Sequence, residues 1–267
     1  MGENTKELRS RMKSVDSTLH LTNAMGLVAS SKLRRASDAN NACAAYTEAC
    51  RRAAAGLAAS GDCQRSLWVA GNGSEQKKLI VIAGDRGLAG GYNANVFRLA
   101  AQTAAGQVIP IGRRACDRYG AEPVSSESYT SAQAHALAKS LCTAFREGRC
   151  DRVAIAATRY VSMMTQEAYV RQLLPLAVPK DKKSGSALFE PDEMTILEAA
   201  IPEYVAGAIM AAVRESFASE VAARRMAMDS AGKNASAMKD DLQLQYNRAR
   251  QGAITQEITE IVAGSGA

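Results

Sequence analysis

Proline is absent from both ends of this chain. Its 267 residues contain six prolines, the first at Pro110 and the last at Pro202, so 109 residues at one end and 65 at the other have none. Aromatic residues make up only 5%. An all-β sandwich or barrel would need turn residues about every ten positions, so this composition excludes that class. With 47% apolar residues the chain should fold, and its proline-free ends predict long helices.

Signals for targeting, membrane insertion and metal binding are also lacking. The first residues are polar and charged, which predicts no secretory signal, and Lys6 occupies the position where myristoylation needs Ser or Thr. No run of about eighteen apolar residues occurs, so we expect no membrane span. The six cysteines form no CxxC pair. We therefore expect reduced, structural thiols and no metal site.

Positive charge is concentrated near the N-terminus. The net charge is +6, and residues 1–52 contribute +4, from nine basic and five acidic residues. Residues 202–267 carry −1, from seven basic and eight acidic residues. A basic segment suits either an acidic protein surface or nucleic acid. Few aromatic residues lie between the basic ones, which argues against nucleic acid.

Two long helices are predicted at the ends of the chain. Apolar residues of segment 3–55 recur at helical spacing, at Leu8, Met12, Val15 and Leu19. In the C-terminal segment, which we expect to begin its first helical turn at Pro202, a seam with a period of seven runs through Met228, Ala235, Leu242 and Ala249. Such a seam predicts a coiled coil. Helices of this kind would be roughly 75–90 Å long, so we expect an antiparallel rod.

The middle of the chain predicts an α/β domain. Short apolar runs closed by turn residues indicate strands, and amphipathic stretches between them indicate helices. This alternation predicts a mainly parallel sheet of Rossmann-like type. Residues 178–193 are expected to form an exposed loop. The predicted strands are 79–85, 107–112, 152–160 and 167–176, the helices are 93–105 and 131–148, and the domains are 1–58, 59–200 and 201–267.

One glycine-rich segment could carry chemistry. AGDRGLAGGYN (83–93) follows a predicted strand and precedes a helix, which is where phosphates often bind. It matches neither GxGxxG nor GK[ST], so both nucleotide fingerprints fail. The alternative is a structural turn that needs positive φ or close packing. Similarly, RRACDR (113–118) suits a solvated helix start, and 246–264 either contacts a partner or is an ordinary amphipathic helix end.

Three blocks of the sequence resemble the gamma subunit of F-type ATP synthases, the central rotor stalk. They are SVDSTLHLTNAMGLVASSKLRRA (14–36), GDRGLAGGYN (84–93) and RRMAMDSAGKNASAMKDDLQLQYNRARQGAITQEITEIVAG (224–264), with QLLPL (172–176) as a weaker fourth. Their order and spacing cover nearly the whole chain. The resemblance implies a coiled coil inserted into the alpha/beta hexamer, and an α/β domain against the epsilon subunit and the membrane c-ring.

The resemblance also implies what the chain does. It would rotate with the c-ring and couple ion flow, of H⁺ or Na⁺, to ATP synthesis or hydrolysis at alpha/beta interfaces. This chain would have no catalytic site, cofactor or metal, and no nucleic-acid partner. The missing chloroplast-type insert and presequence favour the cytoplasmic face of a bacterial plasma membrane over the mitochondrial inner membrane.

Motif positions carry the family's functional residues onto this chain. We interpret the turn residues as structural, and the resemblance implies that the others contact the alpha/beta hexamer. The turn residues are Gly84, Asp85, Arg86, Gly87, Gly90 and Gly91; the partner-binding residues are Met25, Arg34, Arg35, Arg224, Met228, Arg250, Gln251, Thr255 and Glu257.

The chain also departs from the family pattern. Ala89 replaces a usual cysteine, Gly26 a usual glutamate, and Gly232-Lys233 a usual Thr-Asp or Thr-Glu pair. We expect the two glycines to soften the shaft, so that alanine at either would raise stability by a few tenths to about 1 kcal/mol. Two other functions remain as alternatives: a nucleotide-binding enzyme built on the middle domain, and a coiled-coil adaptor or nucleic-acid binder.

Overall fold

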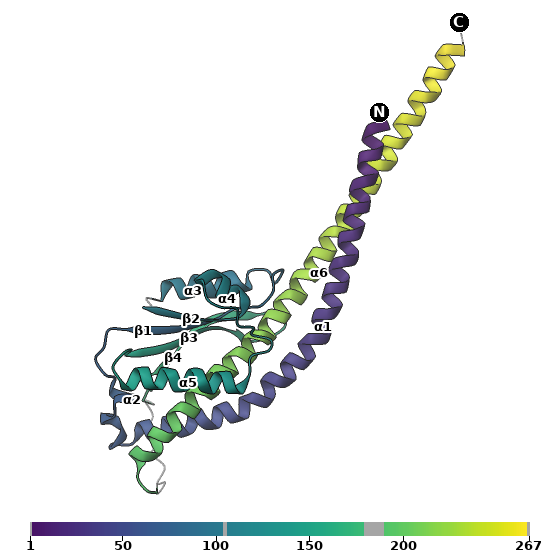
Figure 1. Cartoon of the computed structure of the whole chain (residues 1–267). Coiled ribbons are helices and arrows are strands. Elements are labelled where there is room, and N and C mark those ends of the chain that lie inside the picture. The colour runs from purple at the N-terminus through teal and green to yellow at the C-terminus, as the bar shows by residue number, and fades with distance from the viewer. Residues whose placement is uncertain (1, 104–105, 179–189, 266–267) are drawn as a thin grey trace. The chain divides into compact units, whose positions relative to one another are not determined.

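The computed structural model describes residues 2–103, 106–178 and 190–265. It divides into two compact units, Met1–Ser30 with Arg224–Ala267 (the paired-helix unit) and Ser31–Ala223 (the α/β unit). The elements of the described residues follow in chain order (Figure 1): α1 (Gly2–Ala59), η1 (Cys63–Arg65), α2 (Leu67–Ala70), β1 (Lys77–Ile82), α3 (Tyr92–Gln102), β2 (Gln107–Ile111), α4 (Arg113–Tyr119), α5 (Ser131–Arg146), β3 (Arg152–Tyr160), β4 (Gln166–Leu174) and α6 (Glu193–Ser265).

The paired-helix unit is an antiparallel pair formed by the start of α1 and the end of α6. Asp16 pairs with Lys239, and further along α1 Gly26 faces Met228, so residue numbers rise on one helix as they fall on the other. The predicted heptad seam is buried at its first three positions, Met228, Ala235 and Leu242. On α1, Leu8 is buried, and Met12, Val15 and Leu19 are half-buried. The predicted apolar stripe of each helix therefore faces the other helix.

The α/β unit contains a four-stranded sheet within its described residues, in the order β2-β1-β3-β4. β1 lies between β2 and β3 and is parallel to both, whereas β4 is antiparallel to β3 at the edge. The sequence predicted all four strands and a mainly parallel sheet, and this fold class is confirmed. The predicted strand 79–85 ends at Ile82, because the residues that follow form the glycine-rich turn.

Both faces of the sheet are covered. Along β1, Ile80 and Ile82 belong to the larger apolar core with residues of α5 and α6, whereas Leu79 and Val81 belong to a smaller cluster with Val96 of α3. Successive side chains of a strand point to opposite faces, so one short apolar run supplies both layers. A strand buried on both faces explains why its sequence is continuously apolar.

The start of α6 corrects one prediction. We expected the helix to begin near Pro202, but it begins at Glu193 and Pro202 lies inside it. Asp192 caps this start, because its carboxylate accepts hydrogen bonds from the Thr195 N–H at 2.8 Å and the Thr195 hydroxyl at 2.7 Å. These bonds lower the pKa of Asp192. Most of the predicted loop 178–193 lies outside the described residues.

A segment of α6 has the length and composition of a membrane span. An 18-residue window of this helix has a mean hydropathy of 1.6, and half of the window is buried inside the fold. The sequence prediction of no such segment was therefore too strict. α6 supplies Ile201, Val205 and Ile209 to the α/β core, and a helix packed in a core needs an apolar face. Core packing therefore explains this apolar character.

Candidate functional site

The turn after β1 is organised around the carboxylate of Asp85. Its oxygens accept four hydrogen bonds, from the Ser125 hydroxyl at 2.6 Å and from the backbone N–H groups of Arg113, Ser126 and Glu127 at 3.0 Å each. Burial by itself would raise the pKa of Asp85, but these donors outweigh it and lower that pKa. One carboxylate therefore joins the end of β1, the start of α4 and the loop before α5.

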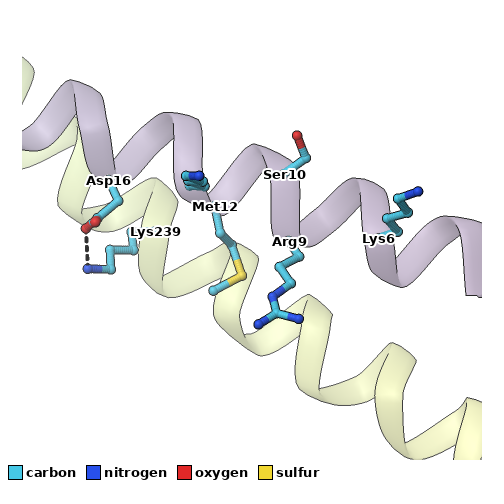
Figure 2. Close-up of a pocket in the computed structure, with 7 residues that line it drawn as sticks. Lys6, Arg9, Ser10, Met12, Asp16 and Lys239 are labelled. Atoms are coloured by element: carbon cyan, nitrogen blue, oxygen red, sulfur yellow. Dashed lines mark hydrogen bonds and ion pairs between the residues drawn. The ribbon is translucent and has the colours of Figure 1, made fainter.

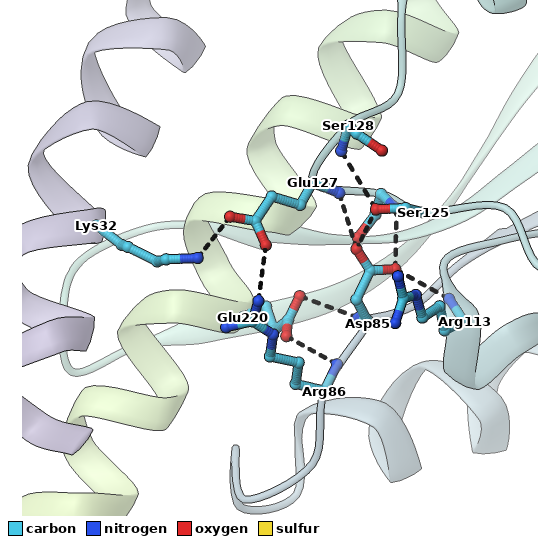
Figure 3. A network of polar contacts seen from close by, with 9 residues as sticks. Lys32, Asp85, Arg86, Arg113, Ser125, Glu127, Ser128 and Glu220 are labelled. Carbon is cyan, nitrogen blue, oxygen red and sulfur yellow. Dashed lines mark hydrogen bonds and ion pairs between the residues drawn. The ribbon is translucent and has the colours of Figure 1, made fainter.

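A second carboxylate reaches the same turn from α6. The two oxygens of Glu220 accept hydrogen bonds from the backbone N–H groups of Asp85 and Arg86, both at 3.3 Å (Figure 3). Glu220 is only 1% exposed. Gly84 leaves room for it, because a Cβ at that position would lie 2.7 Å from the Glu220 Cδ. The turn therefore needs glycine at position 84 while α6 packs against it.

The remaining residues of the turn also have structural uses. Gly90 has a φ of +57°, a conformation that glycine adopts without steric strain. Gly91 directly precedes α3, and a Cβ at Gly87 would lie 3.3 Å from the guanidinium of Arg114. Of the two hypotheses for this segment, these contacts favour a structural turn over a phosphate site.

Glu127 links the turn to α1. Its carboxylate lies 2.5 Å from the Lys32 ammonium and 3.6 Å from the Arg86 guanidinium (Figure 3). All three side chains are partly exposed, so each ion pair adds little stability by itself. These ion pairs instead position the segments, because they connect the loop that contains Glu127 to Lys32 of α1, which is 95 residues away in sequence.

A basic groove lies on the paired-helix unit. It has a volume of about 590 Å³, and it contains four basic side chains but a single carboxylate, Asp16. Lys239 donates a 2.6 Å hydrogen bond to Asp16 and lowers the pKa of that carboxyl group. Basic side chains therefore outnumber carboxylates in the lining, which suits an acidic partner. The lining residues are Lys6, Arg9, Ser10, Met12, Lys13, Asp16 and Lys239 (Figure 2).

The partner-binding positions suggested between residues 25 and 35 of α1 and between residues 224 and 228 of α6 differ in exposure. Arg34 and Arg35 are exposed on the part of α1 that belongs to the α/β unit. Met25 and Arg224 are half-buried, and Met228 is buried in the interface between α1 and α6. In this chain Met228 therefore packs within the helix pair, whereas the two arginines are accessible.

The C-terminal end of α6 presents an exposed surface. All four positions suggested there are exposed: Arg250, Gln251, Thr255 and Glu257. Large apolar side chains on the same stretch are also exposed, namely Ile254, Ile258, Ile261 and Val262. A long helix with exposed apolar residues on its surface indicates a site of protein contact. The suggested residues thus share one accessible stretch.

Sequence reasoning missed Glu220, Glu127 and Lys32. Glu220 had a readable signal, because it is a charged residue within the apolar stretch SFASEVAA (216–223) of a helix expected to pack. A buried carboxylate in such a stretch requires hydrogen-bond donors nearby. Glu127 and Lys32 gave no signal, because the sequence does not distinguish a charged residue that forms an ion pair from one that is only exposed to solvent.

The chain matches known proteins over nearly its full length. The family model for ATP synthase matches residues 4–267. The ATP synthase gamma chain of Moorella thermoacetica is 38% identical over 276 residues, covering 98% of both chains. The ATP synthase gamma chain of Xanthomonas campestris pv. campestris (strain B100) is 38% identical over 282 residues, again covering 98% of both.

A solved structure shares the fold. A chain of the Euglena gracilis mitochondrial ATP synthase, in a structure of its OSCP, F1 and c-ring, superposes with a TM-score of 0.71 at 17% identity, and covers 100% of this chain and 95% of that one. Full-length sequence matches and a common fold agree with each other. The chain therefore belongs to the ATP synthase gamma chain family.

Proposed function

We propose that this chain is the central-stalk subunit of a bacterial F-type ATP synthase, and that it couples transmembrane ion flow to ATP synthesis or hydrolysis by rotating within the alpha/beta hexamer. The observation that carries the proposal is that family similarity continues to the end of α6, where the side chains are exposed in the isolated chain. A stretch that matches its relatives and leaves its apolar side chains exposed is expected to contact another subunit.

The proposed division of labour follows the sequence segments. Residues 1–58 and 201–267 would form the shaft, and residues 59–200 the domain against the epsilon subunit and the c-ring. Arg250, Gln251, Thr255 and Glu257 would contact the hexamer near the tip of the shaft. Arg34 and Arg35, which are exposed and suit an acidic surface, would contact the hexamer lower on the shaft, with the half-buried Met25 and Arg224 beside them. Met228 would act there indirectly, by holding the two helices together.

We infer further that the chain has no catalytic site of its own. The turn after β1 is the natural place for a phosphate in an α/β fold, but here the Glu220 carboxylate accepts hydrogen bonds from its N–H groups. ATP chemistry would then occur on the partner subunits.

Rotor function also implies a location. The complex would bind to the cytoplasmic face of a bacterial plasma membrane through its membrane ring, and this chain would be peripheral. The bacterial source of the similar gamma chains supports this location.

Co-expression tests the proposed function. A tagged version of this chain should co-purify with alpha, beta and epsilon subunits of a similar bacterial enzyme, and the complex should hydrolyse ATP. If the tagged chain is recovered without alpha and beta, the proposal is wrong. Titration of the isolated chain with ATP provides a second check, because submicromolar binding would favour a nucleotide-binding enzyme instead.

A further inference from the structure

The turn after β1 is an anion-binding site whose occupant comes from the same chain. Consecutive backbone N–H groups at the carboxyl end of a parallel strand form a concave, positive surface that suits phosphate or carboxylate. In this chain Asp85 and Arg86 supply those N–H groups, and the Glu220 oxygens lie 3.3 Å from each (Figure 3). A helix side chain thus occupies the place that a ligand phosphate takes in other α/β proteins.

We propose that Glu220 is a positioning residue that locks α6 to the sheet by acting as the internal anion of this turn, and that this lock transmits torque between the sheet and α6. The second half rests on the proposed rotor function. α6 is one continuous helix from Glu193 to Ser265, so a load on its C-terminal part reaches the sheet through the contacts that hold the helix there.

Two neighbouring side chains of α6 support this lock. Ser216, Ser219 and Glu220 lie on one helix face, because residues three and four apart are neighbours. The Ser216 hydroxyl accepts a 3.1 Å hydrogen bond from the Thr158 N–H at the end of β3, and Ser219 donates one of 3.4 Å to the Thr158 carbonyl. The Tyr92 hydroxyl of α3 donates a 2.9 Å hydrogen bond to the Ser216 carbonyl.

These polar contacts add a directional constraint on the register of α6 to the constraint from its apolar packing. Ser216, Ser219 and Glu220 are all at most 1% exposed, and they bind β3, α3 and the turn after β1. Apolar contacts are not directional, whereas hydrogen bonds weaken steeply when their geometry changes. A buried carboxylate that accepts two N–H groups is satisfied in one position only. Glu220 therefore opposes both sliding and rotation of α6 against the sheet.

Amide hydrogen exchange on the full chain tests the lock directly. Glu220→Ala should increase exchange at the Asp85 and Arg86 amides at least tenfold, and formate at about 0.1 M should reverse most of that increase by filling the vacated site. Glu220→Gln keeps the side-chain volume and one acceptor oxygen, but it places an N–H₂ group against one of the two backbone N–H groups. We therefore expect a smaller increase in exchange for this variant. Glu215→Gln is the matched control, because Glu215 is on the same helix and contacts Tyr169 instead.

Two outcomes of the exchange experiment would contradict the proposal. Protection unchanged in both Glu220 variants, or an increase that formate does not reverse, would overturn the lock. If Glu220→Ala does not fold, Glu220→Gln decides, and its exchange at the two amides must exceed that of Glu215→Gln. Because this experiment uses the isolated chain, its result does not depend on the rotor function.

Torque is tested in the assembled complex. Glu220→Gln should lower the number of ions pumped per ATP hydrolysed at least twofold, while assembly and ATP hydrolysis persist. An unchanged ratio, together with faster amide exchange, would show a lock that carries no torque and would overturn the second half of the proposal. Failure of the wild-type chain to assemble with alpha and beta would instead refute the proposed function.

Discussion

Asp85 illustrates how one side chain orders three segments at the residue scale. Asp85 lies in the turn after β1, and its carboxylate accepts hydrogen bonds from the first residue of α4 and from the loop 125–127. Four donors around one half-buried carboxylate stabilise its charged form, which is why its pKa falls although burial opposes this. The sequence predicted a structural role for Asp85 but not its partners.

Replacement of Asp85 by Asn should destabilise the α/β unit by about 1–3 kcal/mol at pH 7. The new N–H₂ group takes the place of one carboxylate oxygen, so the groups that donate to that oxygen lose their acceptor. Chemical denaturation of the two proteins measures this difference. The matched control is Asp117→Asn, since Asp117 is exposed and its ion pair with Arg114 spans 3.9 Å. Equal stability of wild type and Asp85→Asn would contradict this reading of the turn.

The same carboxylate makes a pH prediction. Its pKa is lowered in the folded state, so the unfolded state binds the proton more readily. The stabilisation by Asp85 should be fully present above the unfolded pKa of about 3.9, and should be lost as pH falls through the lower folded pKa. The stability difference from Asp85→Asn should thus stay constant between pH 7 and about pH 5. A difference that shrinks already in that range would contradict the lowered pKa.

At the element scale, the glycines inside the long helices differ in what surrounds them. A Cβ at Gly56 of α1 would meet nothing within 4 Å, whereas one at Gly26 would lie 2.9 Å from the flexible end of Arg225. At Gly232 of α6 it would lie 3.2 Å from the Asn23 amide oxygen. Glycine is intrinsically unfavourable in a helix, so each site gains helix stability from alanine, minus the cost of moving its neighbour.

We therefore expect a graded effect of alanine on thermal stability. Gly56→Ala should stabilise by roughly 0.5–1 kcal/mol, Gly26→Ala by a few tenths, and Gly232→Ala by about zero or less. This order refines the sequence-based expectation, which gave the same gain to Gly26 and Gly232. Melting temperatures of the three variants test it, and a stability gain at Gly232 equal to that at Gly56 would contradict it.

At the scale of the whole molecule, local patterns predicted the elements but not the contacts between distant segments. The four strands were readable because each is a short apolar run closed by turn residues, and the seam through Met228, Ala235 and Leu242 was readable because it repeats. The start of α6 was misplaced because proline favours the first turn of a helix and is disfavoured in its interior, yet Pro202 lies inside this helix. Glu220 was missed because its partners lie about 135 residues away in sequence.

The tip of the shaft gives a prediction for the complex. Charge reversal in Arg250→Glu should weaken assembly with alpha and beta or lower ion pumping per ATP hydrolysed. The reason is that the substitution removes the guanidinium group of an exposed side chain, and with it the directional hydrogen bonds that this group would donate to a partner. Arg248→Glu is the control, since Arg248 is also exposed but lies two residues away on a different helix face. Unchanged assembly and pumping in Arg250→Glu would refute the role proposed for this residue.

Rotation of this chain is the most direct test of a rotor. A probe attached to the α/β unit, in a complex with immobilised alpha and beta subunits, should turn continuously in one direction when ATP is added and stop when ATP is removed. A probe that stays fixed while the same complex hydrolyses ATP would contradict the proposed function.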